Sequence, residues 1–193
     1  MAKSLEDMSL EELWQLFPIF LKEHNKDWAA WYKEESRRIQ SFLPANQLYE
    51  MHHIGSTSIE GIWAKPIIDI LLEIPRSEDM GSIKRELLEH GYLLMSESEG
   101  RMTFNKGYTL QGFAERVFHL HLRYHGDHDE LYFRDYLKVH PDVAKDYEQL
   151  KLTLWKKYEY NRDAYTEAKT DFIRRYTPKA KKLYKRRYDD KIE

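Results

Sequence analysis

The stretch HHIGSTSIEGIWAKPIIDILLEI, residues 52–74, decides the fold of this 193-residue chain. Its second half, residues 66–74, is apolar enough for a buried strand, yet it carries Asp69 and Glu73. Alternate side chains of a strand face opposite sides, so the even-numbered residues form an apolar face and both carboxylates share the other. A buried carboxylate is costly unless a cation, a hydrogen-bond donor or solvent meets it. The pattern therefore predicts a strand with one core face and one face along a cleft.

A possible phosphate site precedes this strand. Gly55 and Ser56 begin a turn, and glycine lets the backbone approach a ligand closely. Ser56 and Thr57 add hydroxyl and N–H groups, and a helical turn starting here would favour an anion. A phosphate site followed by a strand carboxylate is typical of metal-nucleotide binding, where the carboxylate holds Mg²⁺ and the metal bridges phosphate oxygens. We predict phosphate contacts from Gly55, Ser56 and Thr57, and metal ligation by Asp69.

The composition limits the class of protein. The net charge is only −2, so no overall field argues for nucleic acid or membrane, and the absence of cysteine excludes disulfide and thiolate chemistry. The start of the chain, MAKSLEDMSLEELW, lacks the apolar run of a signal peptide. No segment approaches the roughly 20 apolar residues of a membrane span. We expect a soluble cytoplasmic protein without a membrane partner, folded as a single domain over residues 1–193.

Hydrophobic periodicity predicts an α+β fold with a mixed sheet. Helices are expected near residues 9–17, 28–42 and 83–90, and strands near residues 48–54, 66–74, 92–96, 101–105 and 116–124. After Gly126 we expect helices at 130–139, from Pro141 along an apolar stripe to Tyr158, and from Asp163 to Tyr176. We therefore predict an α/β core over residues 20–125 and a C-terminal helical region, 127–185, packed on it.

Five segments, taken in order, resemble the signature of the GrpB family. They are HHIGSTSIEGIWAKPIIDI, RMTFNKG, FHLHLRYHGD, LYFRDYLKVHPDVAKDYEQLK and DAYTEAKTDFI, and the similarity runs from about Trp28 to Tyr176. The resemblance implies the nucleotidyltransferase (DNA polymerase β-like) fold, a mixed sheet flanked by helices. It also implies that the Gly55-Ser56 turn contacts a nucleotide phosphate and that Asp69 binds a metal ion. Fusion of some members to dephospho-coenzyme A kinase hints at a nucleotide or phosphorylated cofactor as the ligand.

The sequence departs from the pattern of active transferases. Such enzymes usually have Asp-x-Asp or Asp-x-Glu on this strand, whereas Leu71 occupies the second position here. Glu73 shares a face with Asp69 but is about 13 Å away along a strand, too far to share an ion. Two interpretations stay open. One is metal-dependent nucleotidyl or phosphoryl transfer, and the other is a catalytically weakened module that binds a nucleotide as a sensor or partner.

A His-x-His pair offers replacement ligands. His119 and His121 must point to the same face of a strand and, with Asp69, could complete a metal site. Alternatively, they hydrogen-bond a substrate phosphate, act as acid and base, or are merely hydrogen-bonded within the sheet. We predict Asp69, His119 and His121 as catalytic and metal-binding residues, with Mg²⁺ or Mn²⁺ as the cofactor. The remaining neighbouring histidines are interpreted as ordinary surface or turn residues: His52, His53, His125 and His128.

Several cations could complete the phosphate site. The candidates, each with a solvated surface charge as the alternative, are Lys65, Arg101, Lys106, Arg134 and Lys169. The predicted partner is a nucleotide or phosphorylated small molecule. Residues 174–193 hold nine Lys or Arg residues and three acids, so RNA binding by this tail is a third hypothesis beside a solvated helix end.

Overall fold

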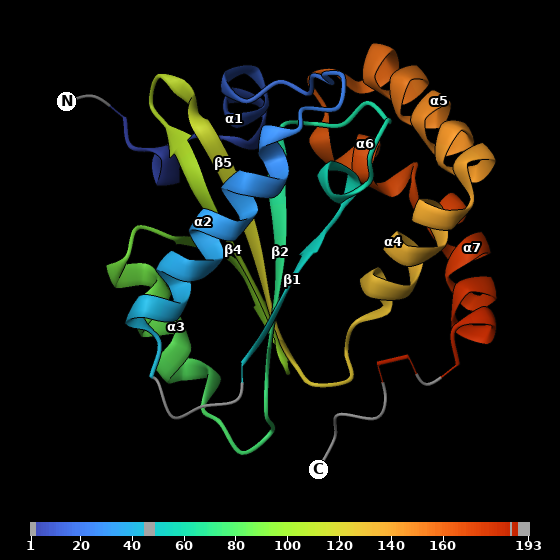
Figure 1. Ribbon diagram of the computed structural model, residues 1–193. Helices are drawn as coiled ribbons and strands as arrows, with labels where there is room; N and C mark the ends of the chain where they lie inside the picture. The colour runs from blue at the N-terminus through green and yellow to red at the C-terminus, as the bar shows by residue number, and fades with distance from the viewer. Residues whose placement is uncertain (1–2, 45–48, 186, 189–193) are drawn as a thin grey trace.

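A five-stranded mixed sheet organises the molecule (Figure 1). This computed structural model describes residues 3–44, 49–185 and 187–188. The strands, in spatial order, are β1 (Glu50–Ile54), β2 (Ile67–Ile74), β5 (Gly112–Tyr124), β4 (Arg101–Thr109) and β3 (Leu93–Ser98). β2 and β5 run parallel, and the other neighbours are antiparallel. The predicted mixed sheet is confirmed, and β2 has hydrogen-bonded neighbours on both sides.

Helices α2 (Asp27–Phe42) and α3 (Met80–Glu89) lie on one side of the sheet, and α4 (Asp129–Val139), α5 (Pro141–Tyr158), α6 (Arg162–Glu167) and α7 (Thr170–Leu183) lie on the other (Figure 1). Helix α1 (Leu10–Leu16) comes first in the chain and lines a pocket together with α6 and β4. Short 3₁₀ turns lie at Leu5–Asp7 (η1) and Ser56–Ser58 (η2). None of the described helices is long and apolar enough to cross a membrane.

One face of the sheet carries the main apolar core. Ile68, Ile70 and Leu72 of β2 are fully buried there and share a cluster with Trp28 of α2 and Ile83 of α3. Each such side chain contributes about 1.5–3 kcal/mol through burial. The predicted even-numbered apolar face is therefore confirmed.

The other face is divided between packing and open space. Leu71, fully buried, meets Ile54 of β1 and Leu131 of α4. A separate cluster joins the loop after β1 to the C-terminal helices through Ile59, Ile62 and Tyr147. Helix α4 thus touches the middle of the strand face, and Asp69 lies to one side of that contact while Glu73 lies to the other.

The final predicted helix is two helices. Asn161, rather than Asp163, caps α6, since its Oδ1 accepts a hydrogen bond from Ala164 N at 3.0 Å. The chain leaves α6 after Glu167 and begins α7 at Thr170, so Lys169 is the N-cap residue of α7.

The start of the first predicted strand, Leu48, lies outside the described residues.

Candidate functional site

Asp69 and the two histidines of the His-x-His pair meet on adjacent strands. The parallel register of β2 and β5 sets Asp69 opposite His119 and Leu71 opposite His121. Asp69 Oδ1 lies 3.4 Å from His119 Nδ1 and 3.4 Å from His121 Nε2. Burial works to raise the pKa of Asp69, but contact with both imidazoles outweighs it and holds that pKa below the ordinary value. Asp69 is therefore ionised at neutral pH.

His119 is a neutral imidazole with a defined tautomer. Burial lowers its pKa to about 4, against the opposing pull of the Asp69 charge. Its Nε2 lies 3.4 Å from Arg162 Nη2 and 2.8 Å from the Tyr108 hydroxyl. Because a guanidinium can only donate, Nε2 accepts and the proton is on Nδ1, which faces Asp69. His119 thus holds the Asp69 carboxylate from one side.

Gly55 lies directly against the Asp69 carboxylate. Its φ is +70°, and a Cβ placed there would be 2.2 Å from Asp69 Oδ2. Only glycine combines that backbone conformation with so close an approach. The first hydrogen bonds of η2 are donated by Ser58 and Ile59, so the turn itself uses neither the Ser56 nor the Thr57 N–H group.

The side chains of Ser56 and Thr57 make contacts different from those of the backbone N–H groups of η2. Thr57 is 2% exposed, and its Oγ1 donates to Ile67 O at 3.2 Å and lies 3.0 Å from His53 Nε2. Its hydroxyl therefore ties η2 to β2. Ser56 and Thr57 both line the cavity beside Asp69.

Cations surround the Asp69 carboxylate in a cavity of about 330 Å³ between the sheet and α5 to α7. Asp69 is the one carboxylate among the described residues that line it. The cations on its walls are Lys65, Lys151, Arg162 and Lys169. An outer cleft of about 810 Å³, bounded by α4 and α7, shares Ser56, Asp69, His121 and Lys169 with this cavity. The two spaces therefore join at Asp69.

Two of these lysines are held without a carboxylate partner in contact. Among the described residues no acid lies within 4.0 Å of the ammonium nitrogen of Lys65 or Lys169. Burial, with neighbouring positive charge, lowers the pKa of Lys65 to about 7 and that of Lys169 to about 8, while Asp69 opposes both shifts. Their nitrogens lie 5.8 and 4.5 Å from the Tyr165 ring centroid. The positive charge in the cavity therefore favours the binding of an additional negatively charged group.

Lys106 does not join this site. It faces the α2 side of the sheet, where it forms an ion pair with Glu35 and lies 5.0 Å from the centre of the Tyr92 ring. Its register partner is Phe118, a residue of the main core. The prediction that Lys106 binds phosphate in the Asp69 cleft is therefore wrong, because strand alternation sends its side chain to the other face.

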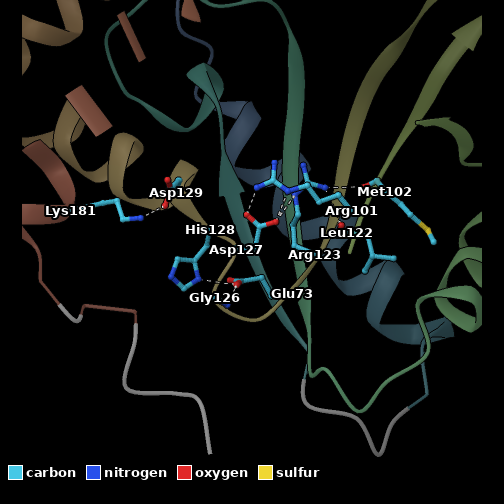
Figure 2. Close-up of polar contacts among 10 residues, drawn as sticks. All are labelled: Glu73, Arg101, Met102, Leu122, Arg123, Gly126, Asp127, His128, Asp129 and Lys181. Carbon is cyan, nitrogen blue, oxygen red and sulfur yellow. Dashed lines mark hydrogen bonds and ion pairs between the residues drawn. The ribbon is translucent and has the colours of Figure 1, made fainter. Parts of the chain in front are cut away.

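Arg101 and Arg134 line the outer cleft but already have partners. Arg101 donates to both oxygens of Asp127 at 2.6 Å (Figure 2). Arg134 donates to His53 O at 3.0 Å, to Asp135 at 2.8 Å and to the Tyr188 hydroxyl. Both guanidiniums stabilise the walls of the cleft, and phosphate binding by either remains a prediction.

Part of the basic tail turns toward the protein. Lys181 Nζ lies 2.7 Å from Asp129, and Arg187 lies 2.8 Å from Asp135. Arg174 and Lys181 line the outer cleft. Arg186 and Lys191 of the RNA hypothesis lie outside the described residues.

The side chains at this site can supply one carboxylate ligand, Asp69, to a phosphate-bound metal ion. They do not supply the ligands that a two-ion centre needs. Leu71, at the usual second carboxylate position, is 0% exposed in an apolar cluster. Among the described residues, one group of three has ligand atoms all within 4.8 Å of one another, and it does not include Asp69, His119 or His121. The side chains of Asp69, His119 and His121 would have to shift before they could share one ion. A two-ion centre needs several converging oxygen ligands.

The structure also contains site residues that sequence reasoning missed. Lys151 falls among the apolar positions of α5, four residues after Tyr147 and three before Leu154, and that spacing was the available signal. Its ammonium group donates to Trp63 O, and burial lowers its pKa to about 7. Arg162 follows a turn and gave no sequence signal.

Two histidines interpreted as surface residues are structural. His128 is 5% exposed, and its Nδ1 lies 2.9 Å from Glu73 Oε1, which also accepts from Gly126 N at 3.2 Å (Figure 2). His53 stacks on Tyr32 with ring centroids 4.8 Å apart. The surface interpretation is wrong for both, because Glu73 and Tyr32 reach them only through the fold.

The family model described as GrpB protein matches residues 18–179. The chain belongs to the GrpB family. It is 33% identical over 169 residues to the UPF0157 protein YqkA of Bacillus subtilis strain 168, covering 85% of this chain and 48% of that relative. The chain therefore spans about half the length of YqkA.

Two solved structures place the GrpB chain among known folds. The conserved protein GrpB from Enterococcus faecalis superposes with a TM-score of 0.74 at 30% identity, over 86% of this chain and 99% of that one. The Cid1 poly(U) polymerase with Mg 3′-dATP bound gives a TM-score of 0.50 at 9% identity, over 82% of this chain and 51% of that one. The latter likeness shows the fold alone, which is nucleotidyltransferase-like.

Proposed function

We propose that this GrpB-family chain binds a nucleotide or another phosphorylated small molecule in the cavity over Asp69. The observation that carries the proposal is the excess of cations around a single carboxylate, with Lys65 and Lys169 lacking an acidic partner in contact among the described residues. Phosphate oxygens would supply the missing negative charge. The N–H groups of Ser56 and Thr57, exposed to the ligand by Gly55, would add donors.

A divalent ion would enter this site together with the phosphate. Asp69 offers one carboxylate, and the surrounding cations would repel a bare ion. Mg²⁺ is commonly held by one or two carboxylates plus substrate phosphates, so Asp69 fits that arrangement, and Mn²⁺ fits it equally. When bound, the ion would draw negative charge from the phosphate oxygens.

Group transfer is a second candidate, favoured by the contact between Asp69 and His121. His121 lines both the inner cavity and the outer cleft, and its Nε2 faces Asp69 Oδ1 at 3.4 Å. In this candidate an incoming hydroxyl oxygen bonds to phosphorus, its proton passes to His121, and the bond to the leaving phosphate oxygen breaks. Asp69 would orient the imidazole and stabilise its charge.

Calorimetric titration with ATP, UTP and pyrophosphate tests the binding proposal. We expect Lys169→Met to weaken affinity at least tenfold, since it removes a half-buried charge beside the proposed phosphate. Lys156→Met, an exposed lysine of α5, is the matched control and should leave affinity unchanged. No saturable binding by the wild-type protein, or equal losses in both variants, would overturn the proposal. Asp69→Asn separates the two candidates, because it should abolish transfer but retain phosphate binding measured without metal.

A further inference from the structure

We propose that Glu50, His52 and Glu73 form a binding site for a divalent transition-metal ion. Glu50 and His52 lie on β1 and Glu73 on β2, and their ligand atoms all lie within 4.8 Å of one another. The site is separate from the phosphate cavity, since Glu73 is four residues, about 13 Å, from Asp69 along the strand. It does not depend on the proposed function.

The strand register places two carboxylates face to face. Glu50 is directly opposite Glu73 in the antiparallel β1–β2 pair. Like charges in that position destabilise a strand pair. Glu73 is 2% exposed, so water does not screen its charge, and its ion-pair partners among the described residues are the histidines His52 and His128. A bound cation would attract both carboxylates.

The separations match those of ligands around one ion. His52 Nε2 lies 3.3 Å from Glu50 Oε2 and 3.6 Å from Glu73 Oε2. Ligands about 2.1 Å from a metal are about 3.0 Å apart at right angles and about 3.4 Å apart in a tetrahedron. His52 Nε2 is buried and has no hydrogen-bond partner among the described residues. Its geometry therefore suits metal ligation better than a hydrogen bond to either acid.

The surroundings of Glu73 orient its second oxygen toward His52. Glu73 Oε1 accepts from His128 Nδ1 at 2.9 Å and from Gly126 N at 3.2 Å (Figure 2). The described residues donate no hydrogen bond to Oε2, which faces His52. Outer contacts of this kind fix ligating carboxylates in metal sites.

The donor set selects the class of ion. Two carboxylate oxygens and one imidazole nitrogen suit Mn²⁺, Fe²⁺ or Zn²⁺ better than Mg²⁺, which prefers oxygen. The side chains of Glu50 and His52 are 26% and 20% exposed, so an ion can enter from solvent and retain water ligands. Bound there, it would join the edge strand β1 to β2.

Titration of the full, EDTA-stripped chain with Mn²⁺ alone, followed by electron paramagnetic resonance, tests the site without nucleotide. We expect one saturable ion. His52→Gln and Glu73→Gln should each weaken affinity at least tenfold. Asp69→Asn should leave it unchanged, as should Glu99→Gln, an exposed turn acid. Absence of saturable binding in the wild type, or loss of binding in Asp69→Asn, would overturn the proposal. Failure of nucleotide binding would leave the result intact.

A thermal-unfolding comparison keeps the proposal falsifiable if the buried variants do not fold. Glu50 lies on the edge strand and is partly exposed, so Glu50→Gln should fold. In EDTA it should unfold at the same or a higher temperature than the wild type, because it removes the like-charge pair. In saturating Mn²⁺ or Zn²⁺ the order should reverse, because the ion stabilises only a chain that binds it. An unchanged order in both solutions would contradict the site.

Discussion

The two ends of the same strand face differ in their balance of charge. At Asp69 one carboxylate is surrounded by four cations, and at Glu73 two carboxylates face each other across a strand pair. Both acids are on β2, four residues apart and on one side of the sheet. The comparison teaches that a carboxylate's position on a strand does not define its partner. The surrounding elements make one end suited to an anion and the other to a cation.

Leu71 keeps these two ends apart. It is fully buried against Ile54 and against Leu131 of α4, and so anchors the C-terminal helices to the sheet. The second carboxylate of active transferases is therefore replaced by a packing residue. In this chain the position contributes to stability and cannot contribute to metal binding.

The largest expected effect comes from restoring the carboxylate. Leu71→Asp would place an unpaired charge in an apolar contact, and we expect the free energy of unfolding to fall by about 4 kcal/mol or more. Urea unfolding measures the loss. Leu71→Met, of similar volume, is the control and should cost less than about 1.5 kcal/mol. A stable Leu71→Asp protein with tighter Mn²⁺ binding would show that the Asp69 and Glu73 ends of the strand face can form one site.

Gly55→Ala should disrupt the proposed phosphate site around Asp69 and leave the proposed metal site at Glu73 intact. The new Cβ would collide with Asp69 Oδ2, and φ of +70° adds strain of about 1–2 kcal/mol. We expect the displaced turn to reduce nucleotide affinity by about 100-fold while Mn²⁺ binding at Glu73 persists. Calorimetry with each ligand separately checks this. Wild-type nucleotide affinity in the folded variant would exclude the turn from the site.

The pH dependence of phosphate binding should sharpen the contrast further. Lys65 and Lys169 have pKa values of about 7 and 8, below their ordinary 10.5, and phosphate favours their charged forms. Affinity should therefore fall as pH rises from about 7 to 10, with protons taken up on binding. Without ligand, stability should instead rise over that window, because the unfolded chain binds more protons. Titration in buffers of different ionisation enthalpy measures the uptake, which Lys169→Met should reduce.

The smallest effect is expected at Arg101. Its guanidinium is 56% exposed and committed to Asp127, so Arg101→Gln should change stability by no more than about 1 kcal/mol. Nucleotide affinity should stay within about twofold of the wild type, whereas Lys169→Met loses at least tenfold. A large loss of nucleotide affinity in Arg101→Gln would show that the proposed phosphate site extends into the outer cleft.

Local patterns predicted the parts of the fold that depend on local physics. The alternation in residues 66–74 predicted both faces of β2. A helix was predicted near residues 9–17, and Ser9 and Glu12 form a capping box at the start of α1. Strand alternation excludes a shared site for Arg101 and Lys106. These residues are five apart on one strand, so they had to face opposite sides.

Other site residues depend on contacts that the sequence does not encode locally. Arg162 reaches His119 across 43 residues, and His128 reaches Glu73 across 55. No spacing rule connects such pairs before the helices are docked on the sheet. The break at Lys169 in the helix predicted from Asp163 to Tyr176 has a different cause, because the apolar residues Tyr165, Phe172 and Tyr176 keep a helical spacing across it.

The contact between Gly55 and Asp69 has an evolutionary consequence. A Cβ at position 55 and a carboxylate at position 69 require the same space, so the two positions should be inherited as a unit. Relatives that retain the acid should retain the glycine, and substitution at position 55 should appear only where position 69 carries a smaller side chain. Under the proposed function, the pair would then mark the relatives that retain the phosphate site.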